Sequence, residues 1–190
     1  MPRLALSLLL VPALLLAGCR RETTVPTRQD RLAAMSVDGV MYGLEHVMTT
    51  SGVRKANLHG DTAYFRDSDS QVDLRGVKLD FFNEATGAVA GTLTSKAGRY
   101  DMRTGAMTAT GDAVLTLQGA DGTRVVSSEE LNYDVQANRV WSDKPTVMKE
   151  NGREVRGASF ESDTKFQNLT VRSARASGPA PSGDEGEVRF

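Results

Sequence analysis

The stretch that decides the fold is residues 93–117, which read LTSKAGRYDMRTGAMTATGDAVLTL. It divides into a strand ending at Tyr100, a turn at residues 103–105, and a second strand that is interrupted at residues 111–112 and then resumes. In the second strand, apolar residues alternate with threonines, as expected when one face of a strand is buried. Thr, Val, Tyr and Leu between Gly-centred turns favour β-structure, and no helical period competes with it. The stretch therefore predicts one module of an antiparallel sheet.

The module recurs along the chain. Residues 127–149 repeat it, an earlier copy at 62–82 aligns after a slip of one residue, and a partial copy lies at 156–163. The aromatic positions that recur are Tyr64, Tyr100, Tyr133 and Phe160. Repeats at intervals of roughly 30 residues are typical of stacked supersecondary units that share one core. The alternative is chance self-similarity of an all-β chain.

The chain begins with a sorting signal. Residues 4–17 form an apolar run that is too short to cross a bilayer core of about 30 Å as a helix. The run and the small residues that follow it predict a cleaved signal peptide over residues 1–18. Residues 16–19, Leu-Ala-Gly-Cys, resemble the bacterial lipoprotein box, which implies acylation of Cys19. The alternative is an ordinary signal peptide followed by an incidental cysteine.

The remaining residues predict one all-β domain between two polar segments. Residues 19–35 lack alternation and are interpreted as the acylated cysteine and a flexible tether. Residues 36–172 carry the alternating runs and predict an open antiparallel β-jellyroll or sandwich built from the strand-turn-strand modules. Residues 173–190, rich in Gly, Pro, Ser and acidic residues, predict a disordered tail. A formal net charge of −1 offers no bulk attraction to nucleic acid.

The domain carries no recognisable pattern for catalysis or metal binding. His46 and His59 are the only histidines and do not match a metal-ligand spacing. Asp67, Asp69 and Asp73 lack the Gly and the terminal Glu of a calcium loop. No phosphate-binding loop is present either. We therefore expect a binding protein with no cofactor and no metal, and not an enzyme.

Alternation places a set of apolar residues on one face of the predicted sheet. These residues are Val77, Leu79, Phe81, Ala113, Leu115, Leu117, Leu131, Tyr133 and Phe160. If the layers close tightly, the set is an ordinary core. If one long edge stays open, the same residues line an apolar groove suited to acyl chains. The alternation is the same in both cases.

Several segments together resemble the LptC family, the periplasmic subunit of the lipopolysaccharide-export ABC transporter. These segments are residues 42–44, 73–77, 93–101, 131–134 and 141–143, and the similarity covers roughly residues 36–171. The resemblance implies an open jellyroll that holds the acyl chains of lipid A. It also implies two partners: the periplasmic domains of the transporter and a bridge protein of the OstA-like family. The best-known members carry an uncleaved transmembrane helix, so the lipoprotein box at Cys19 departs from their pattern.

The expected function is therefore relay of lipopolysaccharide from the inner-membrane transporter to the bridge protein, powered by the partner ATPase. The resemblance implies a periplasmic location, and acylated Cys19 would attach the domain to the inner membrane. The alternative is a non-catalytic scaffolding lipoprotein with a closed β-sandwich.

The last predicted strand, residues 166–172, is the expected docking edge for the bridge protein. It has no proline and few charges, so little protects it from pairing with another strand. Docking would proceed by β-strand addition. The edge residues are Phe166, Asn168, Leu169, Thr170 and Val171. The opposite polarity would use residues 41–49.

Overall fold

The computed structural model describes residues 37–66, 70–119 and 122–178, and these residues form a single antiparallel sheet of twelve strands. The strands are β1 (Gly39–Thr50), β2 (Val53–Phe65), β3 (Gln71–Phe82), β4 (Val89–Asp101), β5 (Ala106–Gly119), β6 (Gly122–Asp134), β7 (Arg139–Ser142), β8 (Thr146–Glu150), β9 (Arg153–Gly157), β10 (Ser159–Asp163), β11 (Leu169–Arg172) and β12 (Arg175–Ser177). The all-β prediction and the open antiparallel sheet are confirmed.

Some predictions fall outside the described residues. They are the signal peptide, Cys19 and the tether, the side chains of Asp67 and Asp69, and residues 179–190 of the tail. Among the residues that are described, none belongs to a helix long and apolar enough to cross a membrane.

The order of the strands follows the chain from β1 to β6 and then divides. One branch continues as β7, β10 and β11, and the other as β8, β9 and β12. The division has a local cause, because residues 143–145 interrupt what would otherwise be one long strand made of β7 and β8. β7 and β8 both pair with β6, which is 13 residues long and therefore has room for the two short strands side by side along its length.

A line of irregular residues crosses the sheet at the middle of the long strands, and we call it the apex line. Gly43, Gly76 and Gly111 lie on it with left-handed φ angles of 65°, 61° and 74°. Between β4 and β5, and again between β5 and β6, the register shifts at this level. Bulges of this kind bend a strand and exchange its two faces. In β3 the register does not shift, but the left-handed Gly76 lies between Leu74 and Val77, which are both buried although they are three residues apart.

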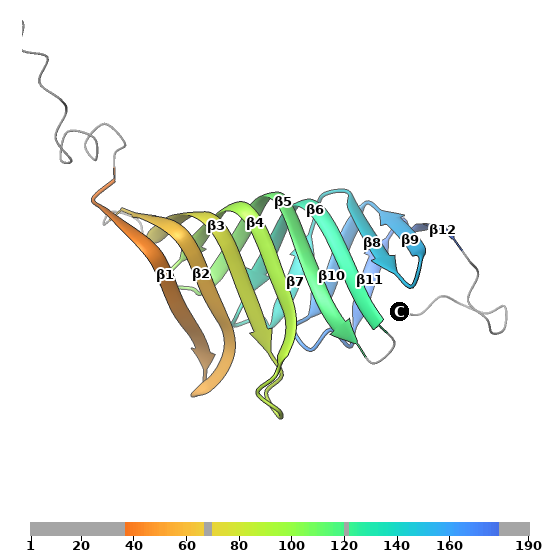
Figure 1. The fold of residues 1–190 in the computed structure, drawn as a ribbon, viewed down its shortest axis with the longest axis horizontal. Coiled ribbons are helices and arrows are strands. Elements are labelled where there is room, and N and C mark those ends of the chain that lie inside the picture. The colour runs from red at the N-terminus through yellow and green to blue at the C-terminus, as the bar shows by residue number, and fades with distance from the viewer. Residues whose placement is uncertain (1–36, 67–69, 120–121, 179–190) are drawn as a thin grey trace, which may run out of the picture.

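The apex line folds the sheet into two arms that face each other. The front arm comprises residues 44–60, 77–95 and 113–128 with β8, β9 and β12, and the rear arm comprises residues 39–42, 62–75, 97–110 and 130–134 with β7, β10 and β11. Phe81 of the front arm meets Tyr133 of the rear arm edge-to-face, with ring centroids 5.1 Å apart. Figure 1 shows β7, β10 and β11 behind the front arm, with β1 at the left-hand end. The core therefore lies between the arms.

Substitution of Gly76 tests whether the apex line requires glycine at this position. A Cβ atom at Gly76 would lie 1.9 Å from Asp61 Oδ2, and its φ of +61° disfavours any side chain. We expect Gly76→Ala to lower the free energy of unfolding by about 2 kcal/mol or more, measured by urea denaturation. Gly87→Ala is the matched control, because Gly87 has a similar φ of +70° but open space around it. Equal losses in the two variants would show that Asp61 moves aside at no cost.

Two details of the predicted organisation need correction. The repeat at residues 62–82 was aligned on Tyr64, but the register places Phe65 in one cross-strand row with Tyr100 and Tyr133. Phe160 pairs with Ser142 and lies in a different row. The predicted disordered tail is also wrong at its start, because β12 pairs with β9 and extends the sheet to Ser177.

Candidate functional site

An apolar row runs through the interior of the front arm from β2 to β9. Its members pair directly with one another across neighbouring strands, and each is at most 2 % exposed. They are Leu58, Leu79, Leu93, Leu115, Val126, Met148 and Val155. Cross-strand neighbours share one face of a sheet. The row is therefore a continuous apolar strip along most of the length of the sheet, and we call it the interior row.

All nine residues predicted to line a groove point into the space between the arms. Each is at most 4 % exposed, and all nine belong to one hydrophobic cluster. Those of β3 and β5 lie in the front arm, whereas Leu131, Tyr133 and Phe160 lie in the rear arm. Side chains from the two arms fill the space between them in this structure. The geometry thus brings the predicted set together as a packed interior.

Part of this interior was not predicted from the sequence. Leu58, Leu93, Val126, Met148 and Val155 complete the interior row but were not among the nine predicted residues. The signal was present, because the same period-two alternation runs through β2 and β8. What was missing was the register that places these residues opposite Leu79 and Leu115.

The buried polar residues are serines and threonines, which are neutral, and the buried serine hydroxyls are hydrogen-bonded. The hydroxyls of Ser128 and Ser142 lie 2.9 Å apart near the apex line. Burial raises the pKa of Tyr100, and it raises the pKa of Tyr133 far above the usual range for a tyrosine, so both phenols remain protonated. At the β1 end, His46 Nε2 lies 2.9 Å from the Tyr100 hydroxyl. The space between the arms is therefore lined mainly by apolar side chains, with a few neutral polar groups among them.

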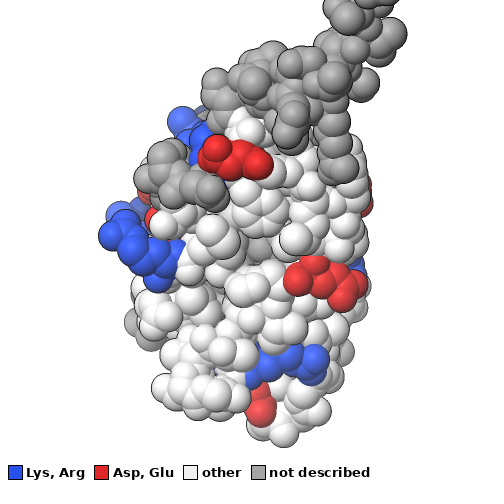
Figure 2. All heavy atoms as spheres, turned by 90° about the vertical axis from the view of Figure 1, so that its left-hand side faces the viewer, with Lys and Arg blue, Asp and Glu red and all other residues white. Residues whose placement is uncertain are grey.

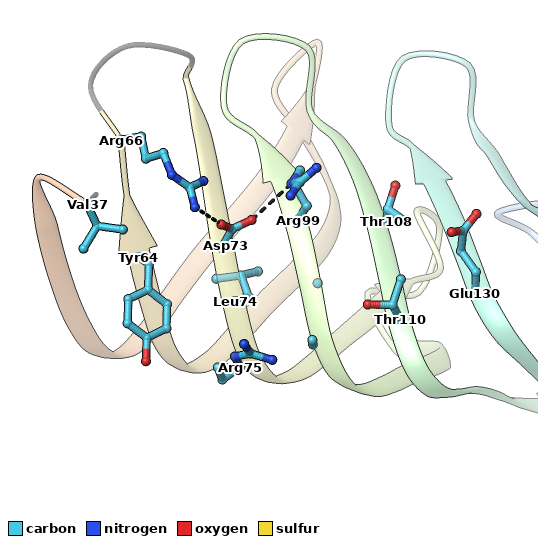
Figure 3. Close-up of a pocket in the computed structure, with 12 residues that line it drawn as sticks. Val37, Tyr64, Arg66, Asp73, Leu74, Arg75, Arg99, Thr108, Thr110 and Glu130 are labelled. Carbon is cyan, nitrogen blue, oxygen red and sulfur yellow. Dashed lines mark hydrogen bonds and ion pairs between the residues drawn. The ribbon is translucent and has the colours of Figure 1, made fainter. Parts of the chain in front are cut away.

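The outer face of the rear arm carries a polar cavity of about 530 Å³. In it, Asp73 accepts hydrogen bonds from Arg66 Nη2 at 2.5 Å and from Arg99 Nε at 3.1 Å (Figure 3). Burial raises the pKa of Asp73, but the two arginines outweigh this effect and hold the pKa below its usual value. The group of three charges is therefore intact at neutral pH and is lost only as the pH falls through that lowered pKa. None of the nine predicted groove residues lines this cavity.

The predicted docking edge is only partly a strand. β11 begins at Leu169 and ends its branch of the sheet, while Phe166 and Asn168 lie in the preceding loop. The loop forms because Asp163 binds it: the backbone N–H of Gln167 donates to Asp163 Oδ1 at 3.0 Å. The strand prediction was therefore wrong for residues 166–168. Within β11, Leu169 is buried, Val171 is half-buried and Thr170 is exposed.

The opposite end of the sheet is β1, and among the described strands its one partner is β2. It exposes three large apolar side chains: Met41, Tyr42 and Val47. Figure 2 views the molecule from this end, and most of the surface that the described residues form there is uncharged. The described sheet therefore presents one edge at β1 and, at its divided far end, one edge at β11 and one at β12.

Comparison with known proteins agrees with this architecture. The solved structure of LptH from Pseudomonas aeruginosa, described as the LptA homologous periplasmic component of the lipopolysaccharide transport device, is similar with a TM-score of 0.50. The similarity covers 66 % of this chain and 95 % of LptH at 16 % sequence identity, and at that identity it supports the fold alone. No curated protein matches the chain. The profile of the family described as "Lipopolysaccharide-assembly, LptC-related" matches residues 6–176, and the chain therefore belongs to this family.

Proposed function

We propose that the chain binds the acyl chains of lipopolysaccharide between its two arms and relays the lipid between partner proteins. Membership of the LptC-related family supports a role in lipopolysaccharide transport in the periplasm. The observation that carries the finer proposal is the interior row, which extends from β2 to β9 without a charged residue. An alkyl chain that enters between the arms gains burial on such a strip at roughly 25 cal/mol per Å² of apolar surface.

The relay requires that lipid pass along the strip from one end of the sheet to the other. The unpaired edge of β1 would join the periplasmic domains of the transporter, and the edge at β11 would join the OstA-like bridge protein. Both joints would extend the sheet: the joint at β1 would lengthen both arms, whereas the joint at β11 would lengthen the rear arm, because the interior row ends in the front arm at β9, next to β12. The chain itself would only bind and guide the lipid, and the partner ATPase would supply the energy.

We also propose that Cys19 is acylated and attaches the domain to the inner membrane. Two or more acyl chains hold a protein firmly to a bilayer, whereas one is marginal. Mass spectrometry of the mature amino terminus tests this: diacyl or triacyl modification of Cys19 supports the anchor, and an unmodified cysteine contradicts it.

Photocrosslinking from matched aromatic positions tests the lipid-binding function. Phe160 is 1 % exposed and points inward from β10, whereas Trp141, on the neighbouring strand β7, belongs to the outward-facing row. With p-benzoylphenylalanine at Phe160, we expect the full-length protein to crosslink to radiolabelled lipopolysaccharide, and we expect none from Trp141. Equal labelling from the two positions would contradict binding between the arms.

The second candidate function is a scaffolding lipoprotein that binds only other envelope proteins. One observation favours it: all nine predicted groove residues are packed against one another and nearly inaccessible. Failure of the folded protein to crosslink lipid from Phe160, together with retained binding to the partner proteins, would favour this function.

A further inference from the structure

The two arms meet again opposite the apex line, along a seam between loop ends. The front side of the seam is the β3–β4 turn at residues 83–88 together with the ends of β5 and β6, and the rear side is the β10–β11 loop at residues 164–168. Two cavities of about 470 and 480 Å³ are lined by residues from both sides. The β10–β11 loop contributes to both cavities, so it lies between them.

Phe166 closes the seam at this loop. Its ring meets Phe81 edge-to-face with centroids 5.4 Å apart, and Phe81 in turn meets Tyr133. Gly91 makes room for the ring, because a Cβ atom there would lie 3.0 Å from Phe166 Cε2 and 2.8 Å from Leu117 Cδ2. The Phe166 side chain is half-buried, with the hydrophobic core on one side and the cavity of about 480 Å³ on the other. The ring therefore occupies the place where the interior would otherwise open to solvent.

The backbone of Phe166 is held in an unfavourable conformation. Its φ is +56°, in the left-handed region, which is rare for a bulky residue that is not glycine. The loop maintains it by bonds within the rear arm: Phe166 N–H donates to the carbonyl of Asp163 at 3.1 Å, and Asn168 Nδ2 donates to Asp163 Oδ2 at 2.7 Å. A conformational cost at one residue that seals an apolar interior indicates a functional constraint on that residue.

The closure across the seam rests on the aromatic contact. Among the described residues, no hydrogen bond or salt bridge joins residues 164–168 to the front arm. The pKa of Glu84 is lowered chiefly by its hydrogen bond with Lys55 in the front arm, and the charge of Lys165 adds only a smaller effect. The salt bridges of the front side are made within that side, between Lys55 and Glu84 and between Arg124 and Glu150. The ring can therefore leave without breaking an ion pair or a hydrogen bond.

From these contacts we infer that the seam at Phe166 is the portal through which an acyl chain enters the interior, and that the Phe166 ring occupies this site when no lipid is bound. The inference rests on the proposed function. The arriving chain displaces the ring and contacts Phe81 and Leu117 in its place, so apolar surface replaces apolar surface. Closure by the ring reduces the apparent affinity for lipid, because only molecules with the ring displaced can bind.

Removal of the ring tests the portal. We expect Phe166→Gly to bind cis-parinaric acid, a fluorescent fatty acid, with an association rate and affinity about tenfold higher than the unmodified protein. Glycine accepts the left-handed φ, so the loop is retained, and an unchanged melting temperature confirms that the protein is folded. Phe82→Ala is the matched control. Phe82 lines the cavity of about 470 Å³, but its ring packs against Arg54, whose Cζ lies 3.7 Å from the ring centroid, and the ring does not seal the interior. Equal rates in Phe166→Gly and the unmodified protein would overturn the portal.

A second variant reports the displacement directly. Phe166→Trp in a Trp141→Phe background places the only tryptophan at the seam. Addition of the fatty acid should shift its emission to longer wavelength as the ring moves into water, and an unshifted spectrum with bound lipid would overturn the portal. In that case lipid crosslinking from Phe160 would still support the proposed function. Absence of all lipid binding in both variants and in the unmodified protein would instead contradict the proposed function itself.

Discussion

Leu115→Asp is expected to unfold the domain, whereas Val114→Asp, one residue earlier, is expected to leave it folded. Leu115 is fully buried in the interior row and is paired with Leu93 on one side and Val126 on the other. A carboxylate there would have no partner, and burial of an unpaired ionised group costs about 4 kcal/mol or more. That is a large part of the roughly 5–15 kcal/mol that stabilises a typical domain.

Val114 is the control for this substitution because it lies in the same strand but on the opposite face. It is half-buried, and a carboxylate on that face remains in contact with water. We expect Val114→Asp to change the free energy of unfolding by about 1 kcal/mol or less. Urea denaturation followed by circular dichroism measures both variants. The same contrast should hold for Asp at Leu79, Phe81 and Leu117.

The result also separates an open groove from a closed core. If the Asp variants stay folded and only lose lipid, the inward residues are in contact with solvent and the arms are open in solution. If they unfold, the arms are packed together without lipid, as the structure has them, and lipid must separate them. Displacement of Phe166 at the seam is then the step that begins this separation.

Thr170→Pro is expected to abolish binding of the OstA-like bridge protein. Thr170 is exposed in β11, the last strand of its branch, and pairs with Glu161 of β10. Proline lacks the N–H that a strand donates and disfavours the ladder, so a partner strand would lose its template. We expect the affinity to fall by at least tenfold, about 1.4 kcal/mol, in a pull-down titration or by calorimetry. Thr170→Ala should retain binding, because main-chain bonds supply most of the affinity in strand addition.

The opposite edge supplies the control for polarity. Tyr42 is 73 % exposed in β1 and pairs only with Thr62 of β2, so Tyr42→Pro should impair the joint to the transporter and leave the bridge protein bound. Photocrosslinkers at Thr170 and Tyr42 identify the neighbouring protein at each end. Unlike the proline variants, they do not depend on whether the backbone N–H of the substituted residue faces the partner strand. Crosslinks to the bridge protein from Tyr42 and none from Thr170 would show that the polarity is reversed.

The alternation of side chains was sufficient to predict much of this protein. It predicted an all-β domain, the two strands around Tyr100 and Met107 with the turn between them, and the inward direction of Leu79, Leu115 and Tyr133. These features are local, because the face of a strand on which a side chain lies depends only on its neighbours in sequence. The residue pattern also indicated the LptC-related family, which the family profile confirms.

Only the tertiary structure decided how the strands bend and which residues meet. The left-handed residues Gly43, Gly76 and Gly111 are far apart in sequence, and strand register aligns them into the apex line. The same register places Leu58 and Leu93 in the interior row and moves the first repeat from Tyr64 to Phe65. Period-two alternation cannot reveal register, because each strand looks the same after a shift of two residues.

Phe166 shows the same limit at a single residue. In sequence it opens the run of residues 166–172, which has no proline and few charges and is predicted to be the edge strand. In the structure the carboxylate of Asp163 binds Gln167 N–H and Asn168 Nδ2 and turns the chain before β11 begins. The Phe166 ring then reaches Phe81, which lies in the other arm and more than eighty positions earlier in the chain. That contact exists only because the sheet folds back on itself, and this is why no local pattern could predict a seal at the seam.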